Sequence, residues 1–322
     1  MTDGSDAPAP TPATGRLRVG FLGPEGTFTE QALLSQGDLA SHVLVALPSI
    51  TDVLFAVEDG EVDYGFVGIE NSIEGAVTAT VDTLAFETDL LIQREVVLGV
   101  QMNLLAPVGV GLPDIRRVVS IPVATAQCRR YLQRELPGVE TVAASSTAEA
   151  ARLVAAEGND GHTAAIAPSV AGKLYGLDVL AVDIEDHPDN ATRFVVVAPR
   201  GVPAPTGHDK SSIVVFQRAD RPGSLLAILQ EFAARAINLT KLESRPTKKG
   251  LGNYCFVIDL EGHVADELVA DCLRDLKSKV AEVKFLGSYP AAGEHGPARR
   301  RDAEASWRQA SDWVQALRDQ IV

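Results

Sequence analysis

The sequence predicts an α/β protein built from two parts, and three observations support this prediction. Between residues 17 and 200, short β-rich runs alternate with helical stretches, as in a layered α/β fold. After a predicted linker at 201–210, which contains proline and glycine, the expected order becomes strand, helix, strand, strand, helix, strand. This βαββαβ order is typical of a ferredoxin-like α+β module. Polar clusters also follow strand-like runs in the first part, where open α/β sheets bind their ligands.

The elements expected in the first part follow from hydrophobic periodicity and helix start signals. Thr27 and Glu30 have the spacing of a capping box, which predicts a helix beginning after Thr27. Strands are predicted at 17–22, 43–47, 64–69, 117–120, 141–144, 164–167 and 191–198, and helices at 49–60, 125–136 and 147–157. We expect the middle of this region to form a second lobe, and 191–198 to return the chain to the first. A ligand site between two lobes is the natural interpretation.

The second part, assigned to 211–290, is shorter and ends in a tail. Its strands are predicted at 212–217, 238–245, 253–260 and 283–289, and its helices at 223–235 and 265–279. Residues 1–16 are expected to be a disordered leader because they are rich in alanine, proline, threonine and aspartate. The tail, 291–322, contains Arg299-Arg300-Arg301 and a helix-like stretch with Trp307, Trp313, Val314 and Leu317. That helix could dock on a neighbouring subunit or stay exposed and frayed.

Composition and charge exclude several classes of function. The chain has 322 residues, 46% of them hydrophobic, so two or three domains could each bury a core. The net charge of -14, from 29 Lys and Arg against 43 Asp and Glu, disfavours binding to nucleic acid or to a membrane surface. Local positive charges would have to bind any anionic substrate. No apolar run approaches the ~20 residues that span a bilayer, and no signal peptide is recognisable, so we expect a cytoplasmic protein.

The three cysteines are Cys128, Cys255 and Cys272, and they lie far apart in the sequence. They show no Cys-x-x-Cys pattern, which argues against a disulfide framework and against a zinc site. We expect them to be buried thiols.

Three polar clusters form the candidate site, and each lies at the end of a predicted strand. Asn190-Ala191-Thr192-Arg193-Phe194 places a hydroxyl, a guanidinium and an aromatic ring at the start of an apolar run. Glu70-Asn71-Ser72-Ile73-Glu74-Gly75 follows the predicted strand 64–69, and the sequence Gly-Pro-Glu-Gly-Thr-Phe-Thr-Glu at 23–30 follows the first strand. Together these groups could bind an anionic ring whose hydroxyl group must leave.

These clusters, with Asn-Leu-Thr-Lys-Leu-Glu-Ser-Arg-Pro at 238–246, resemble prephenate dehydratase with its C-terminal ACT domain. The resemblance covers residues 17–290. The catalytic part of this family resembles a type II periplasmic-binding-protein fold, which agrees with the two predicted lobes. The implied reaction converts prephenate to phenylpyruvate with loss of CO2 and water. Aromatisation drives it, so no redox cofactor or metal is expected, and the sequence offers no convincing site for either.

The resemblance also implies roles for the residues of the Thr-Arg-Phe motif. Thr192 corresponds to the residue associated with catalysis, and we interpret its hydroxyl as a positioned hydrogen-bond donor because threonine is a weak acid. Arg193 would bind a carboxylate through two hydrogen bonds, although a structural ion pair with Glu70 or Glu74 is the alternative. Phe194 would enclose the substrate ring or, alternatively, would be a core residue.

The remaining substrate contacts are expected from both lobes. The loop 23–27 leads into a helix start, where free N–H groups suit an anion. Phe28 is a second candidate for enclosing the ring, with a core aromatic as the alternative. Ser146 and Thr147 resemble the family's Ser-Thr-Ala stretch, but could equally be plain helix caps. The other predicted substrate-binding residues are Thr27, Glu70, Asn71, Ser72, Gln127 and Asn190. Ile121-Pro122-Val123 departs from the family's frequent His-Pro-Gln, which excludes a histidine there.

The last part of the chain resembles the effector-binding ACT domain, which in this family binds phenylalanine between paired domains. The implied effector-binding residues are Gly223, Ser224, Leu225, Asn238, Leu239, Glu243, Ser244 and Arg245. Sheet edges of ACT domains tend to pair, so a homodimer or homotetramer is expected.

Two other functions remain open at this point. Arogenate dehydratase would differ only in accepting an amino side chain in place of the keto side chain, and the sequence does not decide between the two. A non-catalytic, amino-acid-sensing binding protein would keep the two lobes and the ACT domain. The presence of Thr192 beside Arg193 disfavours that last interpretation, because a sensor would not require a donor for a leaving group.

Overall fold

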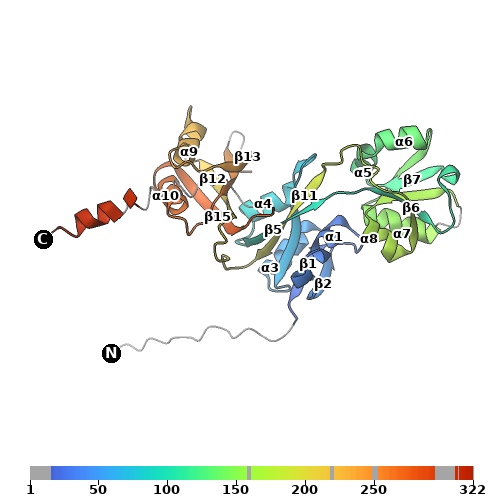
Figure 1. The fold of residues 1–322 in the computed structure, drawn as a ribbon, viewed down its shortest axis with the longest axis horizontal. Coiled ribbons are helices and arrows are strands. Elements are labelled where there is room, and N and C mark those ends of the chain that lie inside the picture. The colour runs from blue at the N-terminus through green and yellow to red at the C-terminus, as the bar shows by residue number, and fades with distance from the viewer. Residues whose placement is uncertain are drawn as a thin grey trace.

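The computed structural model describes residues 16–157, 161–217, 221–248, 253–293, 309–310 and 312–321. Within them the chain forms two lobes and a third, C-terminal unit, each built on its own sheet (Figure 1). The chain leaves the first lobe, completes the second, and returns to the first before it enters the third unit. This is the α/β architecture with a βαββαβ module that the sequence predicts.

The first lobe contains a sheet of order β2-β1-β3-β11-β5, with β4 paired to β3. Strands β1, β2 and β3 are parallel, whereas β11 is antiparallel to both β3 and β5. Its elements are β1 (Arg18–Leu22), α1 (Phe28–Leu34), α2 (Gly37–Ala40), β2 (Val43–Leu47), α3 (Ile50–Glu58), β3 (Tyr64–Asn71), β4 (Gly75–Ala76), α4 (Thr78–Phe86), β5 (Leu91–Gly99) and β11 (Ala191–Ala198). Strands β3 and β11 lie in the interior of this sheet, which explains their nearly continuous apolar runs.

The second lobe contains a sheet of order β10-β6-β9-β7-β8. Its elements are β6 (Asn103–Pro107), η1 (Leu112–Asp114), β7 (Arg117–Ser120), α5 (Pro122–Gln127), α6 (Arg129–Glu135), β8 (Glu140–Ala143), α7 (Thr147–Glu157), β9 (Thr163–Ala167), α8 (Ser169–Tyr175) and β10 (Leu177–Ala181). The single helix predicted at 125–136 is wrong, because the chain forms α5 and α6 with a break at Cys128. Asp186 causes the break: its N–H donates to the carbonyl of Gln127 at 2.6 Å, and its carboxylate accepts from the N–H of Arg130.

The third unit is an antiparallel sheet of order β13-β14-β12-β15. Its elements are β12 (Asp209–Gln217), α9 (Ser224–Ala233), β13 (Leu239–Pro246), β14 (Tyr254–Glu261), α10 (Glu267–Asp275), a π-helical turn η3 (Leu276–Val280) and β15 (Ala281–Pro290). Strand β12 begins at Asp209, inside the segment expected to be a linker, because the Asp209 carboxylate accepts hydrogen bonds from the N–H groups of Thr206 and Gly207.

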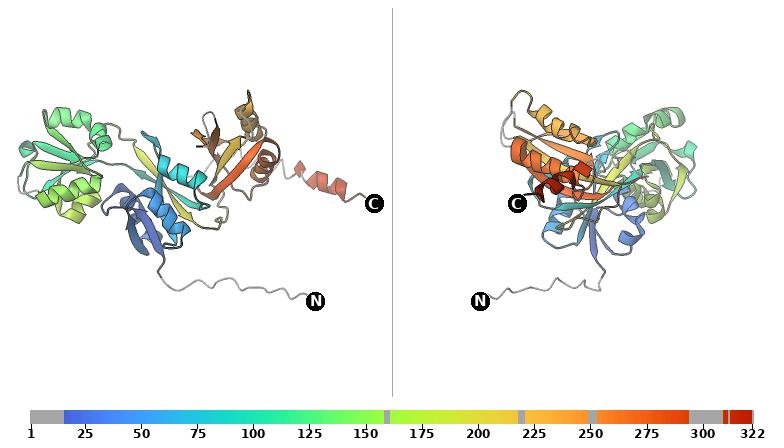
Figure 2. Two further views of the ribbon diagram at one scale, coloured as in Figure 1. Left: turned by 180° about the vertical axis from the view of Figure 1, so that it is seen from behind. Right: turned by 60° about the vertical axis from the view of Figure 1, so that its left-hand side comes forward.

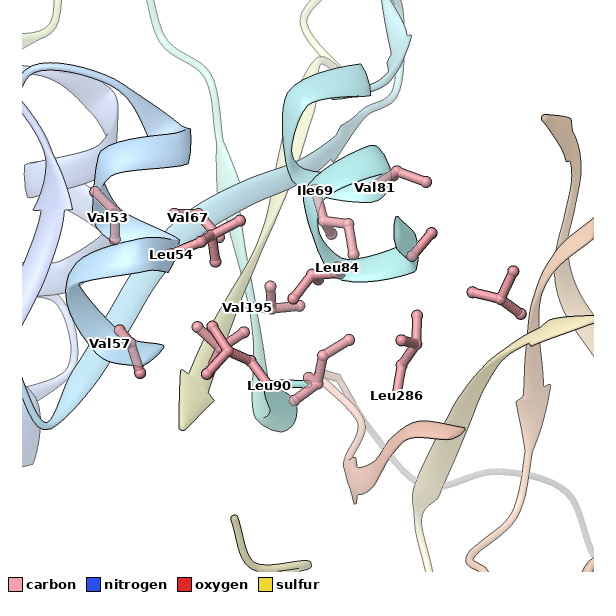
Figure 3. Packing of buried hydrophobic residues seen from close by; sticks show 14 of the residues in the cluster. Val53, Leu54, Val57, Val67, Ile69, Val81, Leu84, Leu90, Val195 and Leu286 are labelled. Carbon is pink, nitrogen blue, oxygen red and sulfur yellow. The ribbon is translucent and has the colours of Figure 1, made fainter. Parts of the chain in front are cut away.

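The first lobe and the third unit share one hydrophobic core. Val195 of β11 packs in the same cluster as Val214, Leu286 and Tyr289 of the C-terminal sheet. Figure 3 shows Leu286 on the side of this core where Leu84 of α4 and Leu90 lie, with the labelled residues of α3 farther away. The contact is also close at the backbone, because a Cβ atom at Gly287 would lie 2.5 Å from the carbonyl oxygen of Ile92. The C-terminal unit is therefore packed firmly onto the sheet of the first lobe.

The tail helix lies apart from these packed units. Residues 312–318 are helical and extend beyond the C-terminal sheet in Figure 1 and in the left-hand view of Figure 2. Trp313, Val314 and Leu317 are exposed on it. Arg299, Arg300, Arg301 and Trp307, which the sequence analysis singled out, lie outside the described residues. No helix in the described part of the chain has both the length and the apolar character needed to cross a membrane.

All three cysteines are free and buried, as predicted from their spacing. Burial raises the pKa of Cys255 to about 11 and that of Cys272 to about 12. These thiols are therefore protonated at neutral pH and poorly suited to act as nucleophiles.

Candidate active site

Asn71 and Thr192 are cross-strand partners at the ends of β3 and β11, and their hydrogen bonds fix the role of the Thr192 hydroxyl. The Asn71 Oδ1 atom accepts from the N–H groups of Ile73 at 2.9 Å and Glu74 at 3.0 Å. These two bonds determine which way the amide points, so the Nδ2 group faces Thr192 and donates to its Oγ1 at 2.9 Å. The Thr192 oxygen thus acts as an acceptor. Its hydroxyl hydrogen is left to donate to another group, such as a substrate.

A chain of amides extends from this pair into the second lobe. Asn190 is buried, and its Oδ1 accepts from Asn71 Nδ2 at 2.9 Å and from Ser72 Oγ at 3.4 Å. Its Nδ2 donates to Gln127 Oε1 at 3.1 Å, and Gln127 Nε2 donates to Glu74 Oε1 at 3.3 Å. Because Gln127 ends helix α5, this network joins the two lobes beside Thr192. The structure therefore brings Asn71, Ser72, Gln127, Asn190 and Thr192 together.

The start of α1 also contacts the second lobe. Thr27 accepts from the N–H of Glu30 at 3.3 Å, while the Glu30 carboxylate accepts from the N–H of Gly26 at 2.5 Å, as expected of a helix-capping arrangement. The Thr27 side chain is buried in this role. Phe28 packs against the hydrophobic core of the second lobe. If Thr27 or Phe28 contacts the substrate, it therefore does so from a loop that is held between the two lobes.

Helix α7 begins opposite this loop. Ser146 Oγ accepts from the N–H of Glu149 at 2.9 Å, so it serves as a helix cap. Thr147 is buried. A Cβ atom at Gly26 would lie 3.4 Å from the Cβ of Ala148, which shows that the first turn of α7 faces the loop 23–27. Ser146 and Thr147 thus lie on the second-lobe side of the same junction.

Arg193 points away from Thr192, and this corrects its interpretation as the partner of a substrate carboxylate. Thr192 and Phe194 both lie beside Gly68, on one face of the sheet, so the intervening Arg193 lies on the opposite face. There Arg193 Nε lies 2.5 Å from Glu95 Oε2, and Nη1 lies 2.5 Å from Asp259 Oδ2.

The alternative prediction for Arg193, a structural ion pair, agrees better with the geometry. Glu70 Oε2 lies 3.3 Å from Nη1, and the closer pairs with Glu95 and Asp259 were not predicted from the sequence. Burial alone would lower the pKa of the guanidinium, but the neighbouring Tyr289, Asp259 and Glu95 outweigh it and raise the pKa. Arg193 is therefore a permanent buried cation.

Phe194 is a core residue rather than a wall of the site. It is 2% exposed, and its ring stacks on Phe66 with centroids 5.3 Å apart and planes 13° apart. The structure thus supports the alternative that the sequence left open for this aromatic. Its contribution to the site is to fix the strand that carries Thr192.

Apart from Glu95 of β5, the residues around Arg193 that were not predicted from the sequence belong to the C-terminal sheet. Asp259 accepts from Ser212 Oγ at 2.5 Å, and Tyr289 Oη accepts from Arg193 Nη2 at 2.8 Å. Tyr289 Oη also lies 2.6 Å from Ser212 Oγ. One signal could have found Asp259: it is an acid inside the otherwise apolar run of β14, and a buried carboxylate requires a cationic partner.

A pocket also lies in the C-terminal unit. It has a volume of about 480 Å³ and is lined by ten residues, among them Arg221, Gly223, Ser224, Leu225 and Ser244. Gly223 has φ of +87°, a backbone conformation that favours glycine. The structure therefore brings four of the predicted effector residues into one pocket.

The other predicted effector residues lie elsewhere in this chain. Asn238 donates to Glu261 at 3.0 Å, beyond the opposite end of β13, and Leu239 packs against the core of the unit. Arg245 contacts the first lobe, where its Nη2 lies 2.6 Å from Asp82 of α4, and it also pairs with Glu243 at 3.3 Å. The effector motif thus faces the catalytic lobe as well as the pocket.

Comparisons with known proteins agree with this arrangement. A family model described as prephenate dehydratase matches residues 19–201, and a model of the ACT domain matches residues 211–278. A prephenate dehydratase from Mycolicibacterium gilvum is 42% identical over 314 residues, covering 94% of this chain and 98% of the relative. The crystal structure of prephenate dehydratase from Arthrobacter aurescens in complex with L-Phe has a TM-score of 0.86 and 40% identity, covering 94% of this chain and 100% of that chain.

A further solved structure shows that the fold is not confined to one activity. GqqA, described as a novel type of quorum-quenching acylase, has a TM-score of 0.75 and 29% identity, covering 88% of this chain and 100% of its own. Fold similarity alone therefore does not determine the reaction, and the functional argument depends on the residues of the site.

Proposed function

The chain belongs to the prephenate dehydratase family, and we propose that it converts prephenate to phenylpyruvate, CO2 and water. The observation that carries the mechanism is the hydrogen bond from Asn71 Nδ2 to Thr192 Oγ1. It leaves the Thr192 hydroxyl free to act as a donor, which is what the departing ring hydroxyl of prephenate requires. The partly buried position of Thr192 strengthens such a hydrogen bond relative to one in water.

The reaction needs little more than this donor and correct placement of the substrate. The bond between the ring and its carboxylate breaks, CO2 leaves, and the bonding electron pair enters the ring. The ring hydroxyl departs with the electrons of its C–O bond and takes up one proton, ultimately from solvent, to become water, while the ring becomes aromatic. Thr192 stabilises the developing negative charge on the departing oxygen. Correct placement of the Thr192 hydroxyl lowers the activation barrier, because a rigid donor is already oriented when negative charge develops on the departing oxygen.

We assign the substrate contacts to the junction between the lobes. Asn71, Ser72, Gln127 and Asn190 supply neutral polar groups beside Thr192, and they would bind prephenate without competing with its negative charges. The loop containing Thr27 lies at the same junction and could bind the side-chain carboxylate through its backbone N–H groups. Such binding would leave the ring carboxylate free of strong cationic contacts, which favours its loss as CO2.

Regulation by L-phenylalanine is assigned to the C-terminal pocket. Gly223, Ser224, Leu225 and Ser244 line it, and the relative from Arthrobacter aurescens was solved with L-Phe. Pairing of two ACT domains would add contacts from residues such as Asn238 that do not line the pocket within one chain. We therefore propose a homodimer or homotetramer, located in the cytoplasm, with phenylalanine as effector.

One experiment tests the activity and its closest alternative. Purified full-length protein is incubated separately with prephenate and with arogenate, and phenylpyruvate and phenylalanine are measured. Rapid formation of phenylpyruvate from prephenate supports the proposal. Turnover of arogenate alone would assign the chain to arogenate dehydratases, and turnover of neither substrate would leave it as a binding protein.

A further inference from the structure

A cluster of charges occupies the boundary between the catalytic sheet and the C-terminal sheet, directly behind Thr192. Strands β3 and β11 pair so that Asn71 lies opposite Thr192, and Glu70 lies opposite Arg193. These two cross-strand pairs are adjacent in the same ladder. The first pair forms the candidate active site on one face, and the second pair faces the C-terminal unit on the other. A displacement of the backbone at Glu70 or Arg193 would therefore also move the backbone of the first pair.

Lys241 of β13 reaches this cluster from the C-terminal unit. Its side chain is 9% exposed, and its Nζ lies 3.6 Å from Glu70 Oε2 and 3.5 Å from Glu243 Oε2. Both distances are too long for a good hydrogen bond. Among the described residues Lys241 Nζ has no hydrogen-bond partner, and neither has Glu243 Oε2. A buried ammonium group without hydrogen bonds is costly, so a small shift toward either carboxylate would be favourable.

The two carboxylates belong to different functional parts of the molecule. Glu70 belongs to the strand that carries Asn71, whereas Glu243 belongs to the segment that carries the pocket residue Ser244. Lys241 thus lies on the strand that carries the pocket residue Ser244, and its ammonium group is within ion-pair distance of Glu70 on the strand that carries Asn71. A ligand that moves β13 would change the distance from Lys241 to Glu70.

We propose that Lys241 is a positioning residue for the dehydratase reaction, which acts through the Glu70–Arg193 pair on the Asn71–Thr192 pair and transmits the state of the effector pocket to the active site. The inference rests on the proposed function. The ammonium group closes on Glu70 in one state and on Glu243 in the other. In each state the ammonium group forms the hydrogen bond that it lacks at its position between the two carboxylates. The two states differ in the alignment of Thr192.

The matched pair of variants is Lys241→Met and Lys284→Met, in the full-length protein. Lys284 also joins the C-terminal sheet to the first lobe, where its Nζ donates to the carbonyl of Thr88 at 2.5 Å, but it lies away from the Glu70–Arg193 pair. We expect Lys241→Met to lower kcat on the order of tenfold, with KM nearly unchanged, and to reduce the response to phenylalanine. Lys284→Met should retain the kcat and phenylalanine response of the unaltered protein.

Two further measurements separate positioning from mere folding. Lys241→Arg keeps a cation and should restore most of kcat. The double variant Glu70→Gln, Lys241→Met should lower kcat no further than the more damaging single change, because both substitutions remove the same interaction between Lys241 and Glu70. Hydrogen exchange in the peptides 66–74 and 190–197 should be faster in Lys241→Met than in Lys284→Met. This readout needs no turnover, so it tests the inference even if the unaltered protein proves inactive on prephenate.

Three results would overturn the inference. The first is a Lys241→Met protein with unaltered kcat, phenylalanine response and hydrogen exchange. The second is an equal loss in Lys284→Met, which would assign the effect to general docking of the C-terminal unit. The third is strict additivity of the Glu70→Gln and Lys241→Met effects.

Discussion

Replacing Arg193 by methionine would test whether the buried ion-pair network holds the C-terminal unit on the catalytic lobe. Methionine keeps much of the length of the side chain and removes only the charge and the hydrogen bonds. The two closest carboxylates, Glu95 and Asp259, are 2% and 3% exposed at their side chains, so solvent cannot compensate for the loss. The cost of leaving a buried charge unpaired should therefore dominate.

The expected loss of stability is about 3–5 kcal/mol, the range for removing one partner of a buried ion pair. The two carboxylates are not affected equally. Lys210 Nζ lies 3.0 Å from both oxygens of Glu95, so Glu95 keeps a cation. Asp259 retains only the neutral donor Ser212 among the partners described above. Most of the loss should therefore arise at Asp259, and the lower end of the range is expected.

Urea unfolding followed by circular dichroism measures this loss, and Arg94→Met is the matched control. Arg94 forms an ion pair with Asp38 at 2.6 Å, but the two side chains are 37% and 58% exposed. Exposed pairs contribute about 0–1 kcal/mol, so the control should be nearly neutral. Equal destabilisation by the two substitutions would refute the assignment of Arg193 to a structural network.

The packing and burial of particular residues determine the expected outcome of three other experiments. Gly287→Ala would place a Cβ 2.5 Å from the carbonyl oxygen of Ile92, so it should lower the melting temperature by several degrees in calorimetry, and an unchanged value would contradict the close contact. Because burial raises the pKa of Cys255 to about 11 and Cys272 to about 12, a thiol reagent at pH 8 should label them only after unfolding, and stability should fall as pH rises from about 9 to about 12. Truncation after Pro205 should give aggregated or inactive protein because it exposes the shared core, whereas a soluble, active fragment would show that the C-terminal unit is separable.

Local patterns were sufficient to predict most elements of the fold. The strand at 191–198 and the helix at 147–157 were predicted with the bounds that the structure shows, because both have clear apolar periodicity. The helix at 125–136 was predicted wrongly, since its break depends on Asp186, a residue far along the chain. Hydrogen bonds between distant segments leave no trace in local periodicity.

For the candidate site, too, local motifs predicted one part and contacts between distant segments decided the other. The motif around Thr192 and Asn71 identified residues that the structure brings together, because adjacent polar strand ends meet at one edge of a sheet. Strand alternation alone places Arg193 on the face opposite Thr192, but its partners Glu95 and Asp259 could not be predicted. What the opposite face contacts depends on how the C-terminal sheet packs, and a sequence treated as two modules joined by a linker gives no information about that contact.

The most direct test of the proposed activity compares the unaltered protein with Thr192→Val in the conversion of prephenate to phenylpyruvate. Valine keeps the methyl group that lies beside Gly68 and removes only the hydroxyl, so the fold should persist. We predict rapid phenylpyruvate formation by the unaltered protein and a loss of about 10² to 10⁴ in kcat for Thr192→Val, the range for a positioned proton donor. Equal turnover by the two proteins, or no turnover by the unaltered one, would contradict the account.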